Sequence, residues 1–118
     1  MIIAVPVDEN KKDVCVSFGR APFFLFKDTE SGAEEFKANP AAEAQGGAGV
    51  IAAQAVVDGR ADALITVRCG ENAAEVFQAA SMKIYKSEGS DARENIAALI
   101  DGRLSELTHF HAGYHGIK

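Results

Sequence analysis

Two cysteines carry the side chains best suited to soft-metal chemistry in this sequence. Cys15 lies between two valines near the start of the chain, and Cys69 follows a short apolar run in its middle. Thiolates suit iron–sulfur, copper(I) and zinc chemistry, but two of them cannot complete the usual four-cysteine iron–sulfur site. They could hold one edge of a preformed cluster whose other metals carry their own sulfides. Free cysteines also pack as small buried apolar side chains, so both interpretations stay open.

Cationic residues and glycines stand close to both cysteines in the sequence. Arg20 and Arg68 could neutralise the charge of an anionic cluster. Gly19 and Gly70 have no Cβ atom, so their backbone amides could approach the sulfides of such a cluster closely. These four residues therefore strengthen the hypothesis of a cluster site.

Three histidines, His109, His111 and His115, lie within the last ten residues. Their imidazoles could bind a metal ion, with His109 and His111 as an H-x-H pair and His115 as a third ligand. An H-x-H pair near the end of a chain is also typical of solvated side chains. The sequence leaves both interpretations open.

A glycine-rich segment at residues 47–52 matches the dinucleotide pattern G-x-G-x-x-A. That pattern needs a strand directly before it and an acidic residue at the end of the next strand. Here residues 39–45 form no strand pattern, and the next apolar run ends at Arg68. We therefore interpret the segment as the glycine-rich start of a helix, which could still attract an anion.

The carboxylates do not predict a nuclease or another enzyme. Asp8, Asp28, Asp62 and Glu71 are the acidic residues that could form a metal-nuclease cluster. Asp28 and Asp62 are expected at the end of the sheet opposite Asp8, and a net charge of −5 opposes a polyanionic substrate. No Ser-His-Asp or Cys-His arrangement can be assembled either. We expect a protein that is not an enzyme.

Hydrophobic patterning predicts the elements that position these residues. The helix within 50–57 should bury Val50, Ala53, Gln54 and Val57, and Ser90 should cap the last helix. The predicted elements are strands at 2–7, 23–28, 33–37, 61–67 and 82–86, and helices that contain residues 50–57, 73–80 and 92–100.

This order, β-β-β-α-β-α-β-α, is that of the ribonuclease H-like motif, an α/β fold with a five-stranded mixed sheet and helices on both faces. In that motif the first strand lies beside the strand at 61–67. The carboxyl ends of these two strands then share one edge of the sheet, where open α/β sheets bind ligands. The loops at 8–22 and 68–72 start from this edge, and each carries one cysteine.

Length and composition limit the class of protein. The 118 residues, 47% hydrophobic and 25% charged, suit one globular domain, which we place at 1–107. We expect a loosely attached tail from Ser105 onward and a flexible histidine-containing tail at 108–118. No apolar run is long enough to span a membrane, and the start of the chain lacks a signal-peptide pattern. We expect a cytoplasmic protein with no nucleic-acid or membrane partner.

Six blocks of the sequence together point to a known family. They are Ser17–Phe24, Gly47–Gly49, Ala63–Thr66, Cys69–Ala73, Lys83–Tyr85 and Gly102–Leu104. In this order they resemble the dinitrogenase iron–molybdenum cofactor biosynthesis family over roughly residues 1–107. The resemblance implies a small ribonuclease H-fold protein that binds or carries iron–molybdenum cofactor or its iron–sulfur precursors. Orange proteins, a related type, hold a mixed molybdenum–copper sulfide cluster.

One position departs from the family pattern. The family usually carries histidine before Phe-Gly, where this chain has Ser17, and a serine hydroxyl is a poor ligand for a soft metal. Cys15, two residues earlier, could substitute for that histidine. Cys69 falls in the second glycine motif of the family. The residues expected to bind the cluster are Cys15, Ser17, Phe18, Gly19, Arg20, Arg68, Cys69, Gly70 and Asn72.

The leading hypothesis is a non-catalytic carrier or scaffold for a transiently bound metal–sulfur cluster. Proteins that donate and accept the cluster would be its partners, and the chain would be a monomer or a weak homodimer. One alternative is a metal-free regulatory interaction module, with an exposed apolar patch near Phe18, Phe23 or Phe24. Another is a thiol redox sensor that forms a Cys15–Cys69 disulfide.

Overall fold

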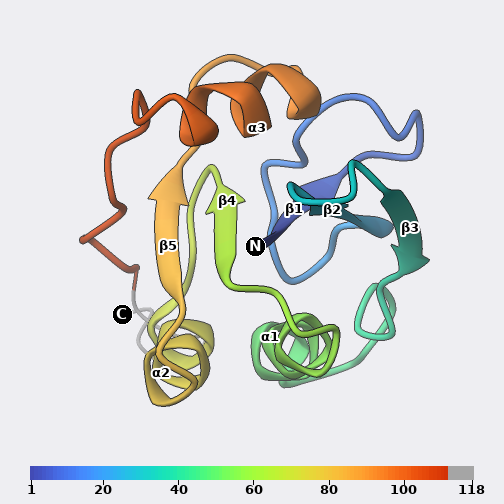
Figure 1. Ribbon diagram of the computed structural model, residues 1–118. Helices are drawn as coiled ribbons and strands as arrows, with labels where there is room; N and C mark the ends of the chain where they lie inside the picture. Colours follow the sequence, from blue (N-terminus) through green and yellow to red (C-terminus); the bar gives the residue numbers. More distant parts are fainter. Residues whose placement is uncertain (112–118) are drawn as a thin grey trace.

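A computed structural model describes residues 1–111, which form the eight elements that the sequence predicts, in the predicted order (Figure 1). The first two strands match the predicted boundaries, α3 covers the predicted residues 92–100, and the other elements differ from the prediction by a few residues. The elements are β1 (Ile2–Val7), β2 (Phe23–Asp28), β3 (Glu34–Ala38), α1 (Ala48–Asp58), β4 (Ala63–Thr66), α2 (Glu71–Ala79), β5 (Lys83–Lys86) and α3 (Ala92–Ile100).

The strands form one open mixed sheet in the order β3-β2-β1-β4-β5. β1 pairs antiparallel with β2 and parallel with β4, and β4 pairs parallel with β5. This arrangement confirms the ribonuclease H-like motif. Because β1 and β4 run parallel, their carboxyl ends meet at one edge of the sheet, which we call the carboxyl edge.

Helices cover both faces of the sheet, with α1 and α2 on one face and α3 on the other (Figure 1). The side chains of β1 divide between the two cores. Ala4 belongs to the core under α1 and α2, whereas Ile3 and Val5 belong to the core under α3. A strand buried on both faces needs an unbroken apolar sequence, as residues 2–7 have. Within residues 1–111 no helix has the length and apolar character needed to cross a membrane.

The prediction of the buried face of α1 was right for Ala53 and wrong for Val50 and Gln54. The helix buries Ala52, Ala53 and Val56 against the sheet, while Val50 is 41% exposed. The segment 48–57 has apolar residues on every side, so its periodicity does not select one face. Tertiary packing selects the face with two small alanines.

The start of α3 also differs from the prediction. Asp91, not Ser90, is the N-cap, and its side chain accepts a hydrogen bond from the Glu94 amide at 2.9 Å. The carboxylate therefore satisfies one of the amides that the first turn of a helix leaves without a partner.

The segment 105–111 is not loosely attached, in contrast to the expectation for the tail. The Lys86 amide donates to the Ser105 carbonyl at 2.9 Å, and the Leu107 amide donates to the Ile84 carbonyl at 2.7 Å. These bonds satisfy the outer edge of β5, an edge that a sheet otherwise leaves open. We call residues 105–111 the C-terminal strap. The rest of the predicted tail, with His115, lies outside the described residues.

The predicted separation of the carboxylates is confirmed. Asp28 pairs with Ile2 at the amino end of β1, and the Ile2 amide donates to Asp62 Oδ2 at 2.7 Å. Asp8 follows the other end of that strand. These three carboxylates therefore do not form one cluster.

Candidate functional site

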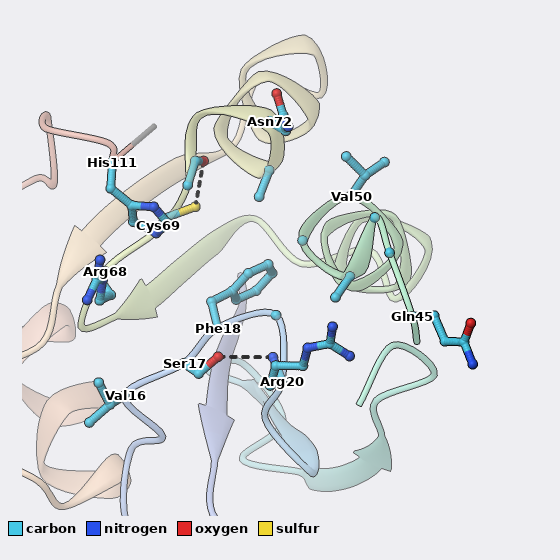
Figure 2. A pocket seen from close by; sticks show the side chains of 17 residues that line it. Val16, Ser17, Phe18, Arg20, Gln45, Val50, Arg68, Cys69, Asn72 and His111 are labelled. Carbon is cyan, nitrogen blue, oxygen red and sulfur yellow. Dashed lines mark hydrogen bonds between the residues drawn. The ribbon is translucent and has the colours of Figure 1, made fainter. Parts of the chain in front are cut away.

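A pocket of about 780 Å³ opens at the carboxyl edge (Figure 2). Its volume is in the range of typical small-ligand sites. The loop after β1, the starts of α1 and α2, and the end of the C-terminal strap form its walls. Its lining residues are Val16, Ser17, Phe18, Gly19, Arg20, Gln45, Gly46, Gly47, Ala48, Gly49, Val50, Arg68, Cys69, Gly70, Asn72, Ala73 and His111.

The loop at 17–20 is fixed by one hydroxyl and one aromatic ring. Ser17 Oγ accepts a hydrogen bond from the Arg20 amide at 3.2 Å, which closes the turn. The Phe18 ring is 4% exposed and packs against Phe24 and Phe77, with both centroid distances at 5.5 Å. Phe18 thus anchors this wall to the core, and Ser17 shapes it.

Gly19 allows a close approach where this loop meets α1. A Cβ atom at Gly19 would lie 3.3 Å from the amide nitrogen of Gly49, closer than most Cβ contacts. The loop therefore lies directly on the first turn of α1, and the amides of that turn remain next to the pocket.

Asn39 organises two walls of the pocket, and the sequence analysis did not identify it. Its Nδ2 donates to the carbonyls of Gly19 at 3.0 Å and Ala21 at 2.9 Å, and its Oδ1 accepts from the Ala41 amide at 2.9 Å. The side chain is 5% exposed. Asn before Pro is a common start of a turn, and this was the only signal in the sequence.

Arg20 holds the loop that leads into α1. Its Nη1 donates to the carbonyl of Ala44 and, at 3.5 Å, to those of Ala41 and Ala42. The guanidinium group thus stabilises this loop and also places a positive charge beside the pocket. Arg68, on the opposite wall, is exposed.

The helices α1 and α2 both begin at the pocket without a side-chain cap among the described residues. Their N-cap residues are Gly47 and Gly70. In the structure of residues 1–111, the amides of Ala48, Gly49 and Val50 have no hydrogen-bond acceptor. Free amides at the positive end of a helix favour anions. At α2 the Glu71 amide donates to the His111 carbonyl at 2.9 Å, and the amides of Asn72 and Ala73 have no acceptor among residues 1–111.

Cys69 lies at the base of the wall formed by the loop after β4. Thr66 Oγ1 donates to the Arg68 carbonyl at 3.2 Å, which fixes this loop. The Cys69 thiol is 1% exposed and donates to the Gly70 carbonyl at 3.5 Å. Burial raises the pKa of the thiol to about 12, so it is protonated at neutral pH. A soft metal would have to displace that proton.

Cys15 does not line the pocket, whereas the other residues expected to bind a cluster all line it. Its half-buried side chain packs against the core under α1 and α2. Burial and the neighbouring Asp8 carboxylate raise the pKa of the Cys15 thiol. Raised pKa values make both thiols less reactive, which disfavours a redox sensor.

The two histidines within the described residues lie at different places relative to the pocket. His111 lines the pocket, whereas His109 does not, and its Nδ1 lies 3.5 Å from Thr108 Oγ1. His115 is outside the described residues. In the described part of the chain, no three His, Cys, Asp or Glu side chains converge to hold a metal ion.

The rings of Phe18, Phe23 and Phe24 do not themselves form an exposed apolar patch. Phe18 and Phe24 are buried, and Phe23 is half-buried, because their rings fill the two cores. Exposed apolar side chains lie at the pocket instead. Val16 is 62% exposed and Val50 is 41% exposed, and both line the pocket.

The fold is that of a small α/β protein with an open five-stranded sheet, and the pocket lies at the carboxyl edge of this sheet. The family model described as dinitrogenase iron–molybdenum cofactor matches residues 1–102, and the chain belongs to this family. The comparison with curated proteins finds no match.

Solved structures support the same relationship. The apo form of the orange protein from Desulfovibrio gigas shares 32% identity, with a TM-score of 0.83 over 91% of this chain and 92% of that chain. A Thermotoga protein provisionally assigned as NifB, of the DUF35 family, shares 37% identity and a TM-score of 0.77 over 92% and 95%. A provisionally assigned dinitrogenase from Methanocaldococcus jannaschii, at 22% identity and a TM-score of 0.71 over 92% and 96%, shows the fold alone.

Proposed function

We propose that the protein is a non-catalytic carrier that binds an anionic metal–sulfur cluster, or its precursor, in the pocket at the carboxyl edge. The observation that carries the proposal is the meeting of two uncapped helix starts at one pocket. Membership of the iron–molybdenum cofactor family supports an iron–molybdenum cargo. The proposal extends to iron–sulfur precursors and molybdenum–copper sulfide species, which share the anionic metal–sulfide chemistry.

The donors around the pocket suit a cargo that brings its own ligands. Cys69 supplies one soft donor and His111 an imidazole, while backbone amides and two guanidinium groups complement negative charge. Since no three-ligand group exists within residues 1–111, protein side chains there cannot form a complete coordination sphere. A cluster with bridging sulfides, held mainly by hydrogen bonds and charge, fits this donor set and favours transient binding.

Because the whole chain is acidic, binding of an anionic cargo depends on the cationic side chains and amides at the pocket. The chain carries a net charge of −5, so long-range electrostatics oppose an anionic cargo. Arg68 and the free amides of α1 must therefore supply the attraction at short range. Proteins that donate or accept the cargo would dock over the exposed Val16 and Val50 at the pocket.

Anaerobic reconstitution tests the proposal. The protein is incubated with iron, sulfide and molybdate, passed over a gel-filtration column, and examined by visible absorption and metal analysis. We expect a coloured protein that retains metal, a loss of retention in Cys69→Ser, and retention in Cys15→Ser because Cys15 lies outside the pocket. A colourless, metal-free wild-type protein would overturn the proposal.

A further inference from the structure

The C-terminal strap extends the pocket with residues beyond the part of the chain that matches the family model. The match ends at residue 102, whereas the strap covers residues 105–111. Figure 1 shows this segment running beside β5 toward the start of α2. The strap brings His111 to the pocket wall opposite α1.

Backbone hydrogen bonds join the end of the strap to the loop that carries Cys69. The His111 amide donates to the Cys69 carbonyl at 3.2 Å, and the Glu71 amide donates to the His111 carbonyl at 2.9 Å. Together they form a parallel bridge between Gly70 and His111. Two bonds on either side of Gly70 fix the backbone of His111, and Leu107 and Phe110 pack against the core under α1 and α2.

The imidazole of His111 lies against Gly70. A Cβ atom at position 70 would stand 3.1 Å from His111 Cε1 and 3.5 Å from Nε2, so glycine makes room for the ring. Figure 2 shows the ring beside Cys69 and on the same side of the pocket as Arg68. A buried thiol, an imidazole and a guanidinium group therefore border one part of the pocket.

We propose that His111 is a cargo-binding residue and that its imidazole contacts the anionic metal–sulfur cargo next to Cys69. This inference rests on the proposed function. The imidazole is a ligand or hydrogen-bond donor suited to metal–sulfide anions, and the strap places it through backbone bonds that do not involve the ring. The strap is thus part of the binding site, and cargo binding stabilises its docked position, since any ligand stabilises the state that binds it.

Titration with tetrathiomolybdate, a coloured metal–sulfide dianion, tests this role. The Kd is measured by visible absorption for the wild type, for His111→Ala and for the matched control His109→Ala, whose side chain lies outside the pocket. We expect the Kd of His111→Ala to rise by about tenfold or more, as the loss of a contact to a charged group typically gives. The absorption spectrum of the bound anion should also shift in His111→Ala, and His109→Ala should match the wild type.

The outcomes separate this inference from the proposed function. If the wild type binds tetrathiomolybdate and His111→Ala binds it with the same Kd and spectrum, the role of His111 is overturned and the carrier function stands. If the wild type binds neither tetrathiomolybdate nor reconstituted metal, both fall. Circular dichroism of His111→Ala should match the wild type, because the strap is held by backbone bonds, and a second variant, His111→Gln, keeps a polar side chain and should lose less affinity.

Discussion

The helices on the two faces of the sheet begin in different ways. On one face, α3 begins at Asp91, whose carboxylate accepts the Glu94 amide at 2.9 Å. On the other face, α1 and α2 begin at glycines, and no side chain among residues 1–111 caps them. A side-chain cap accepts hydrogen bonds from the amides of the first turn, so those amides are not available to a ligand. At the pocket, the amides of residues 48–50 and 72–73 stay available to an anion, whereas the Glu71 amide donates to the His111 carbonyl.

The largest change in anion affinity is expected when the first turn of α1 receives a carboxylate, since the start of α3 already has one at Asp91. Ala48→Asp places a carboxylate in the first turn of α1, at the pocket wall. Charge–dipole attraction should stabilise the protein by about 0.3–1 kcal/mol, whereas repulsion of an anionic cargo should raise the Kd for tetrathiomolybdate by about a hundredfold.

The control for Ala48→Asp is Gln78→Glu, which makes the same change in net charge at an exposed site near the far end of α2. Its Kd should stay within about twofold of the wild type, because exposed charges beyond roughly 10 Å are screened at 0.1 M salt. Equal losses of affinity in the two variants would show that net charge, not the helix start, governs binding.

Two buried asparagines offer a matched pair on the two faces. Asn39 makes three hydrogen bonds to the pocket loops, and Asn95 makes three to the loop before α3: to the carbonyls of Gly89 and Asp91 and from the Glu88 amide. Replacing either with Ala leaves buried polar groups unsatisfied, so each variant should lose about 2–3 kcal/mol in urea unfolding. Only Asn39→Ala should also weaken binding of tetrathiomolybdate. If both bind as the wild type does, Asn39 does not shape the site.

A second matched pair concerns exposed arginines. Arg68→Ala removes a charge beside the pocket, and the Kd should rise by about tenfold, or about 1.4 kcal/mol, with stability changed by less than about 0.5 kcal/mol. Arg93 lies on α3 and forms an ion pair with Glu34, with 2.7 Å between Nη2 and Oε1. Arg93→Ala should leave the Kd unchanged. A loss of affinity in Arg93→Ala as large as that in Arg68→Ala would contradict a local role for Arg68.

The last effect, absent at neutral pH, is a pH dependence of stability from the Cys69 thiol on the pocket side. Its pKa rises from an ordinary value of 9.0 to about 12 in the folded protein. Both states hold the proton below pH 9, whereas the unfolded state releases it first at higher pH. The free energy of unfolding should therefore fall by about 1 kcal/mol per pH unit between pH 9 and 11 from this group. Chemical unfolding at several pH values should show a smaller decline in Cys69→Ala, and identical slopes would refute the effect.

Local sequence patterns predicted the sheet and the pocket loops well. The unbroken apolar run at 2–7 gave β1 its boundaries, and the order of strands and helices gave the carboxyl edge, where Ser17–Arg20 and Arg68–Gly70 meet. The buried face of α1 was predicted only in part because its sequence is apolar on every side.

The contribution of Asn39 and the docking of the C-terminal strap were missed for a different reason, although the sequence had offered His111 as a candidate ligand. Both depend on hydrogen bonds between segments far apart in the sequence. Asn39 bonds to carbonyls of residues 19 and 21, and His111 bonds to the backbone on both sides of Gly70. No periodicity or local spacing encodes such bonds, and Cys15 shows the converse, since its short distance in sequence from Ser17 does not bring it to the pocket.

The most direct test of the account is a map of backbone amide NMR shifts during titration with tetrathiomolybdate. The amides of the first turns of α1 and α2, at residues 48–50 and 72–73, should shift in a saturable manner. The amides at residues 92–95 in the capped first turn of α3 should not move. Saturable shifts centred on α3, or no saturable shifts at all, would contradict the claim that the uncapped helix starts form an anion site.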